Sequence, residues 1–187
     1  MAVMAAAAFA VACGTGGTTK GSGAGDAAAA IEVDTLLSRA ADLTGKEVTV
    51  EGICTHICQH GGKKIFLMGT DDTKSIRIEA GEGIGVFDAG CVNNVVRVTG
   101  RLVEDRIDES YLANWERSLA DQTAEEHGTE GEGGCDTEKQ ARGESLTAST
   151  AQRIADFRAR IAERKQREGK EYLSFYHVAA ESYEILK

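Results

Sequence analysis

The sequence predicts a mainly β domain with α-helical additions, in which five strands close into a small barrel. Apolar and polar residues alternate at 48–50, 76–79 and 95–98, as expected for strands with one buried face. A last strand-like stretch, 172–186, follows a charged helical region. Four or five strands in an open sheet of this size would leave exposed edges, so closure into a barrel is favoured.

Composition limits the class of partner. The chain has 187 residues, of which 42% are hydrophobic, enough for one folded domain with additions. Its formal net charge is -9. Proteins that bind nucleic acid through its phosphates usually carry a basic patch, so this charge makes a nucleic-acid partner unlikely.

The N-terminus predicts export. Residues 2–12 are small and apolar and lead to Cys13, a stretch too short to span a bilayer. We expect residues 1–13 to be a lipoprotein signal peptide with Cys13 lipidated, and the Gly/Ala/Ser/Thr-rich residues 14–30 to be a flexible tether. The protein would then be located in the cell envelope, on the extracytoplasmic side of a membrane to which its lipid anchors it. The alternative is an alanine-rich disordered tail.

The folded domain, 31–187, is expected to follow a simple order. A helix at 33–43 precedes strands at 46–57, 65–69, 75–80 and 95–103; a helical insertion at 106–171 separates the fourth strand from the last, 172–186. Within the insertion, 111–119 and 146–170 have helical periodicity, and 121–144 is an acidic, glycine-rich stretch expected to be a mobile loop. The apolar phase changes across Gly52, which predicts a bulge or bend.

Two motifs carry a family resemblance. The first strand of an OB-fold barrel resembles the stretch Leu43-Thr44-Gly45-Lys46-x-Val48-x-Val50-x-Gly52. The fourth strand of such a barrel resembles the stretch Val95-Val96-Arg97-Val98-Thr99-Gly100. A closer likeness is to exported bacterial OB-fold lipoproteins with a Cys-x-His-x-Cys-x-x-Gly-Gly-like hairpin. The resemblance implies ligand binding on the face of strands 2 and 3 and at the loops 58–64 and 105–170. The long insertion departs from a minimal OB-fold.

The first hairpin carries the candidate site. Metal-ligand residues occupy every second position from Cys54 through His56 and Cys58 to His60. Alternate side chains of a strand share a face, and imidazole with thiolate suits zinc or copper. His56, Cys58 and His60 are the best trio, because the chain reverses at Gly61. Candidates for a fourth ligand are Cys91, His127, Cys135 and His177.

Disulfides are the competing interpretation of the same residues. Once Cys13 is lipidated, Cys54, Cys58, Cys91 and Cys135 remain, and an even count in an exported protein is typical of disulfides. The simplest pairing joins Cys91 to Cys54 or Cys58. A redox role is disfavoured, because the spacing is Cys-x3-Cys on a strand.

No catalytic motif is present, so the sequence predicts a binding protein rather than an enzyme. The ligand loop would be Gly61, Gly62, Lys63 and Lys64, beside the Cys/His cluster. We expect a lipid-anchored module that binds a soft metal or a small ligand. The alternatives are a structural or interaction protein with a disulfide-stapled barrel and a partner docked at 106–171, and an oligosaccharide- or nucleic-acid-binding barrel.

Overall fold

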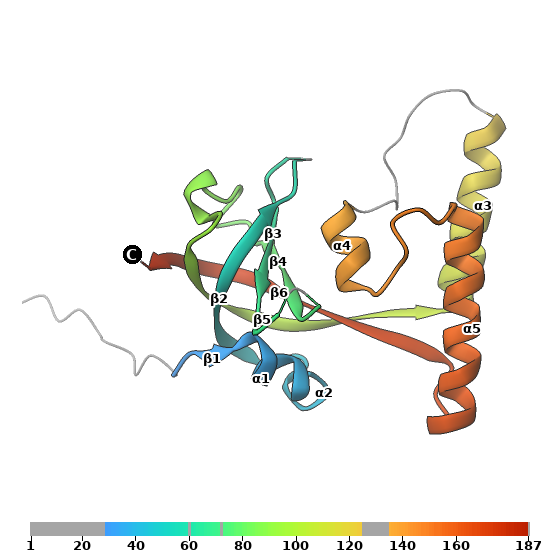
Figure 1. Cartoon of the computed structure of the whole chain (residues 1–187), viewed down its shortest axis with the longest axis horizontal. Coiled ribbons are helices and arrows are strands. Elements are labelled where there is room, and N and C mark those ends of the chain that lie inside the picture. Colours follow the sequence, from blue (N-terminus) through green and yellow to red (C-terminus); the bar gives the residue numbers. More distant parts are fainter. Residues whose placement is uncertain (1–28, 60, 72, 125–134, 187) are drawn as a thin grey trace, which may run out of the picture.

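The computed structural model describes residues 29–59, 61–71, 73–124 and 135–186, without the side chains of residues 120–124. A closed barrel lies at one end, and a long two-stranded ribbon connects it to a helical lobe (Figure 1). The described strands are β1 (Ile31–Glu32), β2 (Glu47–Ile57), β3 (Lys64–Met68), β4 (Ser75–Ala80), β5 (Val95–Asp108) and β6 (Tyr172–Leu186).

Five strands, β2 to β6, close the barrel. Their order is β2-β3-β4-β6-β5, and β5 pairs back with β2. The β4–β6 pairing is parallel and the other pairings of the barrel are antiparallel, which is the OB-fold arrangement. The short β1 pairs parallel with β2 and was not predicted from the sequence. The prediction of a five-stranded OB-fold-like barrel is therefore confirmed.

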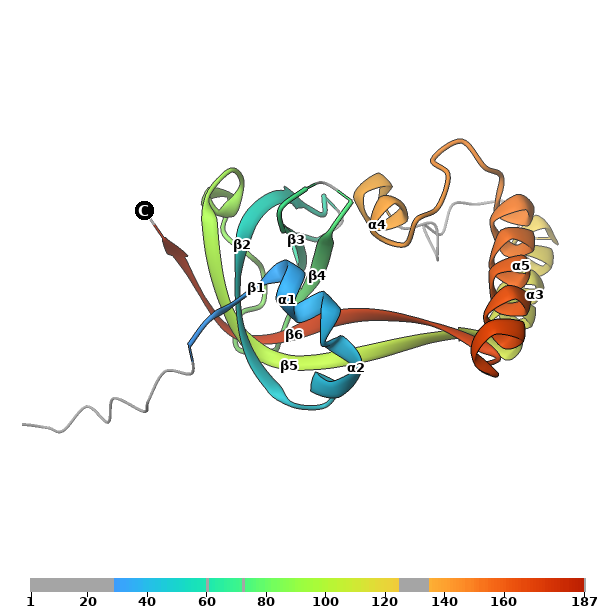
Figure 2. The ribbon, with the colours of Figure 1, turned by 60° about the horizontal axis from the view of Figure 1, so that its bottom comes forward.

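The barrel core is formed by the inward residues of these alternating strands. Val50, Ile65, Leu67, Ile78 and Val98 are fully buried. The predicted first helix is divided at Arg39 into α1 (Val33–Ser38) and α2 (Ala40–Leu43), which pack beside the barrel (Figure 2). Burial of Val33, Leu36 and Ala40 adds α1 and α2 to the core.

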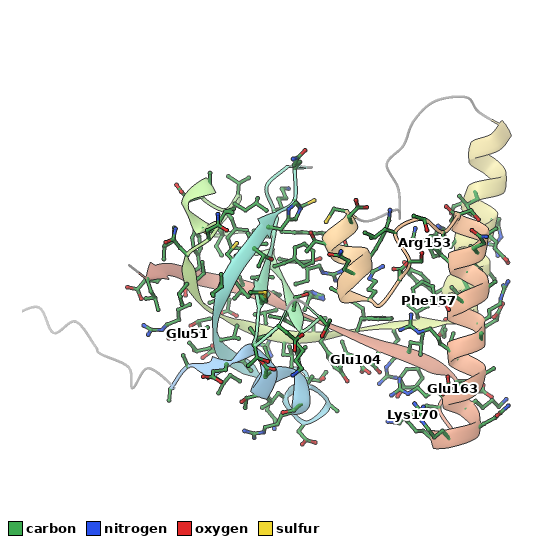
Figure 3. The ribbon with its side chains drawn as sticks, in the orientation of Figure 1. Glu51, Glu104, Arg153, Phe157, Glu163 and Lys170 are labelled. Carbon is green, nitrogen blue, oxygen red and sulfur yellow. The ribbon has the colours of Figure 1, made fainter. Side chains whose placement is uncertain are left out.

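The main helices follow β5 in the chain and precede β6. They are α3 (Glu109–Ala124), α4 (Asp136–Ala141) and α5 (Thr150–Glu168); the described residues between β4 and β5 contain only the 3-10 turn η1 (Ala89–Cys91). Ser149 and Gln152 form a capping box at the start of α5, and Gly169 ends it with φ of 71°. A second core, around Leu112, Trp115, Ile154 and Phe157, joins α3 and α5 to the ribbon (Figure 3).

The expectation of a loop throughout 121–144 was wrong for residues 121–124, which end α3, and for residues 136–141. Residues 136–141 form α4, which lies between the barrel and the helical lobe in both views (Figures 1 and 2). A helix of six residues is too short to show helical periodicity in the sequence. Its position depends on ion pairs with the barrel, described below, rather than on an apolar stripe.

Candidate functional site

A bulge in β2 divides the predicted Cys/His cluster between two faces of the barrel wall. Cys54 pairs with Leu67 and His56 pairs with Phe66, so one extra residue of β2 lies between neighbouring pairs. Paired residues point to the same side of a sheet, and an extra residue reverses the alternation. Cys54 therefore faces inward with Leu67, whereas His56 faces outward with Phe66.

The inward cysteine lies in the barrel core beside Cys91. Both thiols are fully buried. The Cys54 backbone is hydrogen-bonded to the backbone of Asn93 and Asn94, just after η1. Burial, with a smaller contribution from Cys91, raises the pKa of the Cys54 thiol to about 11. Burial also raises the pKa of Cys91. Because the thiolate is the reactive form, both residues are protected from reaction.

The predicted metal site is not assembled among the described residues. No group of three or more His, Cys, Asp or Glu side chains there is placed to hold a metal ion. The bulge separates Cys54 and Cys91 from His56 and Cys58, while His60, His127 and the chain around Cys13 lie outside the described residues. The fourth-ligand candidate His177 is engaged elsewhere, with Asp105.

The predicted disulfide joining Cys91 to Cys54 or Cys58 is also absent. The four cysteines of the described part, Cys54, Cys58, Cys91 and Cys135, form no disulfide. A Cys58–Cys91 bond is opposed by the bulge, because Cys91 belongs to the core and Cys58 continues the outward face of His56. Cys54 and Cys91 are neighbours in the core as thiols.

The outward face of β3 and β4 is covered by α4. On this face Phe66 pairs with Arg77, and Lys64 pairs with Glu79. Phe66 is fully buried although it is outside the barrel core, as expected for a residue beneath a covering element. In an OB-fold this is the face that binds ligands.

Arg77 holds α4 on the outward face of β3 and β4. Its Nη1 donates to Glu138 of α4 at 2.6 Å, and its Nη2 donates to Asp105 of β5 at 2.6 Å. Arg142 Nη2 donates to the same Glu138 oxygen at 2.8 Å, and Lys64 Nζ lies 3.6 Å from the other oxygen. Only 8% of the Glu138 side chain is exposed, so a carboxylate from the acidic stretch is buried and surrounded by three cations.

The charges around Arg77 set the pKa of its partners. Burial alone would raise the pKa of Glu138, but Arg142, Arg77 and Lys64 outweigh burial and hold it below its ordinary value. Burial is likewise outweighed at Asp105, whose pKa is lowered by His177 and Arg77. Both carboxylates are thus held in the ionised form by the cations beside them.

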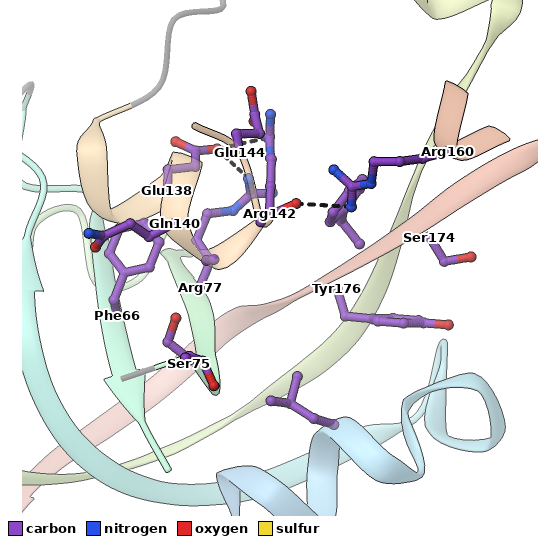
Figure 4. Close-up of a pocket in the computed structure, with 15 residues that line it drawn as sticks. Phe66, Ser75, Arg77, Glu138, Gln140, Arg142, Glu144, Arg160, Ser174 and Tyr176 are labelled. Atoms are coloured by element: carbon purple, nitrogen blue, oxygen red, sulfur yellow. Dashed lines mark hydrogen bonds and ion pairs between the residues drawn. The ribbon is translucent and has the colours of Figure 1, made fainter. Parts of the chain in front are cut away.

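A cavity of about 650 Å³ lies beside this network, between the β3–β4 face, α4 and the start of the helical lobe (Figure 4). Its apolar part is formed by Phe66, Phe175 and Tyr176, and its polar part includes three arginines and two glutamates. These charged residues are Arg77, Arg142, Arg160, Glu138 and Glu144.

Three groups that line the cavity, among them Arg77 through its Nε, have unused hydrogen-bonding capacity. Arg160 Nη2 donates to the Arg142 carbonyl at 3.1 Å, while its buried Nη1 lies 3.5 Å from Asp156 and makes no hydrogen bond with any described residue. Glu144 accepts from Arg153 with one oxygen, and its other oxygen has no hydrogen-bond partner among the described residues. Buried polar atoms are ordinarily satisfied, so these atoms indicate room for a polar ligand.

The predicted ligand loop forms the turn of the β2–β3 hairpin. Gly61 and Gly62 turn the chain with φ of 84° and 63°, values that favour glycine. Gly62 lines a second hollow of about 440 Å³ together with His56, Cys58 and Phe87. The Lys63 carbonyl accepts a hydrogen bond from the Ala80 backbone N–H. The Lys64 side chain reaches Glu138 of α4.

Few signals in the sequence marked the residues beneath α4. Arg77 and Glu79 were expected to face outward, and they do, but the arginine is only 11% exposed. A large aromatic residue, Phe66, at an outward position of the neighbouring strand was the available signal that this face is covered. Glu138, Arg142 and Glu144 carried no such signal, because they lie 61 or more residues away in the chain from Arg77.

Comparisons with known proteins assign this chain to no family. No protein-family model matches the chain, and no curated protein matches it. A solved structure described as that of an aspartyl-tRNA synthetase from Leishmania major Friedlin matches at 18% identity with a TM-score of 0.32. The match covers 48% of this chain and 18% of that protein. Separately, none of the helices in the described ranges is long and apolar enough to cross a membrane.

Proposed function

We propose that this chain is a lipid-anchored, extracytoplasmic, non-enzymatic binding module that takes a small organic anion in the cavity under α4. The observation that carries the proposal is the position of that cavity. It lies on the outward face of β3 and β4, the face that OB-folds use for ligands, and it combines aromatic walls with guanidinium groups.

The charges of the lining favour a carboxylate ligand with an apolar body. Glu138 is already paired with Arg77 and Arg142, and Glu144 is paired with Arg153. Arg160 Nη1 lies 3.5 Å from the half-exposed Asp156 but is buried and makes no hydrogen bond in the described part of the chain. An anionic group would accept from Arg160 while an apolar ring packs against Phe175 and Tyr176.

Calorimetric titration with 3-phenylpropionate, against the neutral 3-phenylpropionamide, tests the ligand site. We expect the acid to bind and the amide to bind much more weakly. Arg160→Met should weaken binding about tenfold or more, the effect of losing a charged hydrogen bond. The matched control Arg167→Met removes a 63%-exposed arginine of the same helix and should leave binding unchanged. Equal binding of acid and amide would contradict the proposal.

The anchor is tested on the full chain expressed in a bacterium. Its support is the pattern of residues 2–13 alone, which ends in Ala12-Cys13. The chain should partition into detergent and carry a lipid mass on an N-terminal cysteine, and Cys13→Ser should remain in the aqueous phase. An unlipidated chain with an intact N-terminus would contradict this part of the proposal.

Soft-metal binding remains a second candidate, because His56 and Cys58 share the outward face after the bulge. Nε2 of His56 is buried and makes no hydrogen bond to any described residue. Zinc or copper held there should be lost in His56→Ala and retained in Cys91→Ala, whose cysteine lies in the core. Elemental analysis of protein purified without chelator measures this, and a metal-free wild type would exclude it.

A further inference from the structure

The structure brings Cys58 and Cys135 together where α4 meets the barrel. Cys58 donates its backbone N–H to the Lys64 carbonyl at 2.9 Å, so it lies opposite Lys64 across the hairpin. Lys64 in turn points outward and reaches Glu138 of α4. Residues directly opposite on antiparallel strands share a face, which directs Cys58 toward α4 as well.

Cys135 reaches the same place from α4. It is the N-cap residue of that helix, three positions before Glu138, and residues three apart lie on one side of a helix. Burial, with smaller contributions from neighbours that include Cys58, raises the pKa of the Cys135 thiol. Glu138 is held to the barrel by Arg77 and Lys64, so the N-terminal end of α4 is fixed beside the hairpin.

We propose that Cys58 and Cys135 form a reversible disulfide that fastens α4 over the β3–β4 face. The bond would link the start of α4 covalently to the β2–β3 hairpin, beside the ion pairs of Glu138, and would keep α4 over the cavity. This inference does not depend on the identity of the ligand. It differs from the pairing expected from the sequence, because the core pair Cys54 and Cys91 stays reduced.

The oxidant is a small-molecule or protein disulfide, such as glutathione disulfide. One protein thiolate attacks a sulfur of glutathione disulfide, forms a mixed disulfide and releases one glutathione thiolate. The second protein thiolate attacks the mixed disulfide, forms the Cys58–Cys135 bond and releases the second glutathione. Two electrons and two protons leave the protein and appear in two molecules of glutathione. Cys135 is only partly buried, so it is the residue that the oxidant reaches first.

The test is peptide mapping of the full chain carrying Cys13→Ser, oxidised by glutathione disulfide in the presence of a chelator. Trypsin leaves Cys58 and Cys54 in residues 47–63, Cys91 in residues 78–97 and Cys135 in residues 118–139. We expect a cross-link between 47–63 and 118–139 that disappears in Cys58→Ser and in Cys135→Ser. The second change is conservative for folding, because serine is a good N-cap.

Hydrogen exchange measures the consequence for α4. In the oxidised protein, amides of residues 136–141 should exchange about thirtyfold more slowly or more, which corresponds to the lower end of the usual stabilisation by a disulfide. Reduction should restore the rate. A cross-link between 47–63 and 78–97, a 47–63 to 118–139 link that survives Cys58→Ser, or four reactive thiols after oxidation would each overturn the proposal.

Discussion

Arg77→Met should release α4 from the barrel. The arginine side chain is 11% exposed and bonds directly to Glu138, which is 8% exposed. Breaking a buried ion pair by removing one partner costs about 3–5 kcal/mol, because the other charge stays buried. Arg142 and Lys64 remain beside Glu138, so we expect a loss near the lower end, about 3 kcal/mol.

The assay is urea unfolding followed by circular dichroism, together with hydrogen exchange of residues 136–141. Arg77→Met/Glu138→Leu should recover most of the loss, because an apolar replacement of a buried pair is close to neutral. The control Arg97→Met removes a barrel arginine that is 43% exposed, and should cost less than about 1 kcal/mol. The proposed anchoring is refuted if Arg77→Met lowers the free energy of unfolding no more than Arg97→Met does. It is also refuted if the double variant loses as much stability as Arg77→Met and Glu138→Leu lose together when measured singly.

Three further perturbations test the fold and its electrostatics. The pKa of Glu138 is lowered in the folded protein, so its ionised form stabilises α4 fully above the unfolded pKa of about 4.3. This stabilisation is lost as the pH falls through the folded pKa, and hydrogen exchange of the α4 amides should become faster over that pH range. Glu138→Gln should flatten this pH dependence. Gly100→Ala would place a Cβ 2.2 Å from the Ala179 carbonyl oxygen and should cost about 2 kcal/mol or more in chemical denaturation. The control Gly83→Ala adds its Cβ in open space and should leave stability unchanged. Equal denaturation midpoints for the two variants would contradict the β5–β6 register. Phe157→Ala removes a 1%-exposed ring from the second core and should cost about 3–5 kcal/mol, read from tryptophan fluorescence; an unchanged midpoint would contradict the packing of that lobe.

The barrel could be predicted because its strands carry their own signals. The bounds expected for β4 and β6 agree with the structure, and the glycine-containing motifs identified β2 and β5. Alternation within each strand depends on residues two apart, so a single sequence reveals it. The extension of β5 to Asp108 was missed, because its outer half pairs with β6 beyond the barrel and packs on helices.

The site could not be predicted in the same way, because it depends on partners distant in the chain. Alternation placed Cys54 and Cys58 on one face, and the bulge after Cys54 places them on opposite faces. The bulge is positioned by pairing with β3, at Thr55, beyond the glycine at which the sequence indicated a bend. Glu138 belongs to an acidic stretch that looks solvated until Arg77 is placed beneath it.

The proposed ligand site is the β3–β4 face under α4. Amide chemical-shift mapping of the protein during titration with 3-phenylpropionate tests it most directly. We expect the shifts to concentrate at Phe66, Arg142, Arg160 and Phe175, which line the cavity. Shifts confined to the hairpin around Gly62, or no saturable shifts at all, would contradict it.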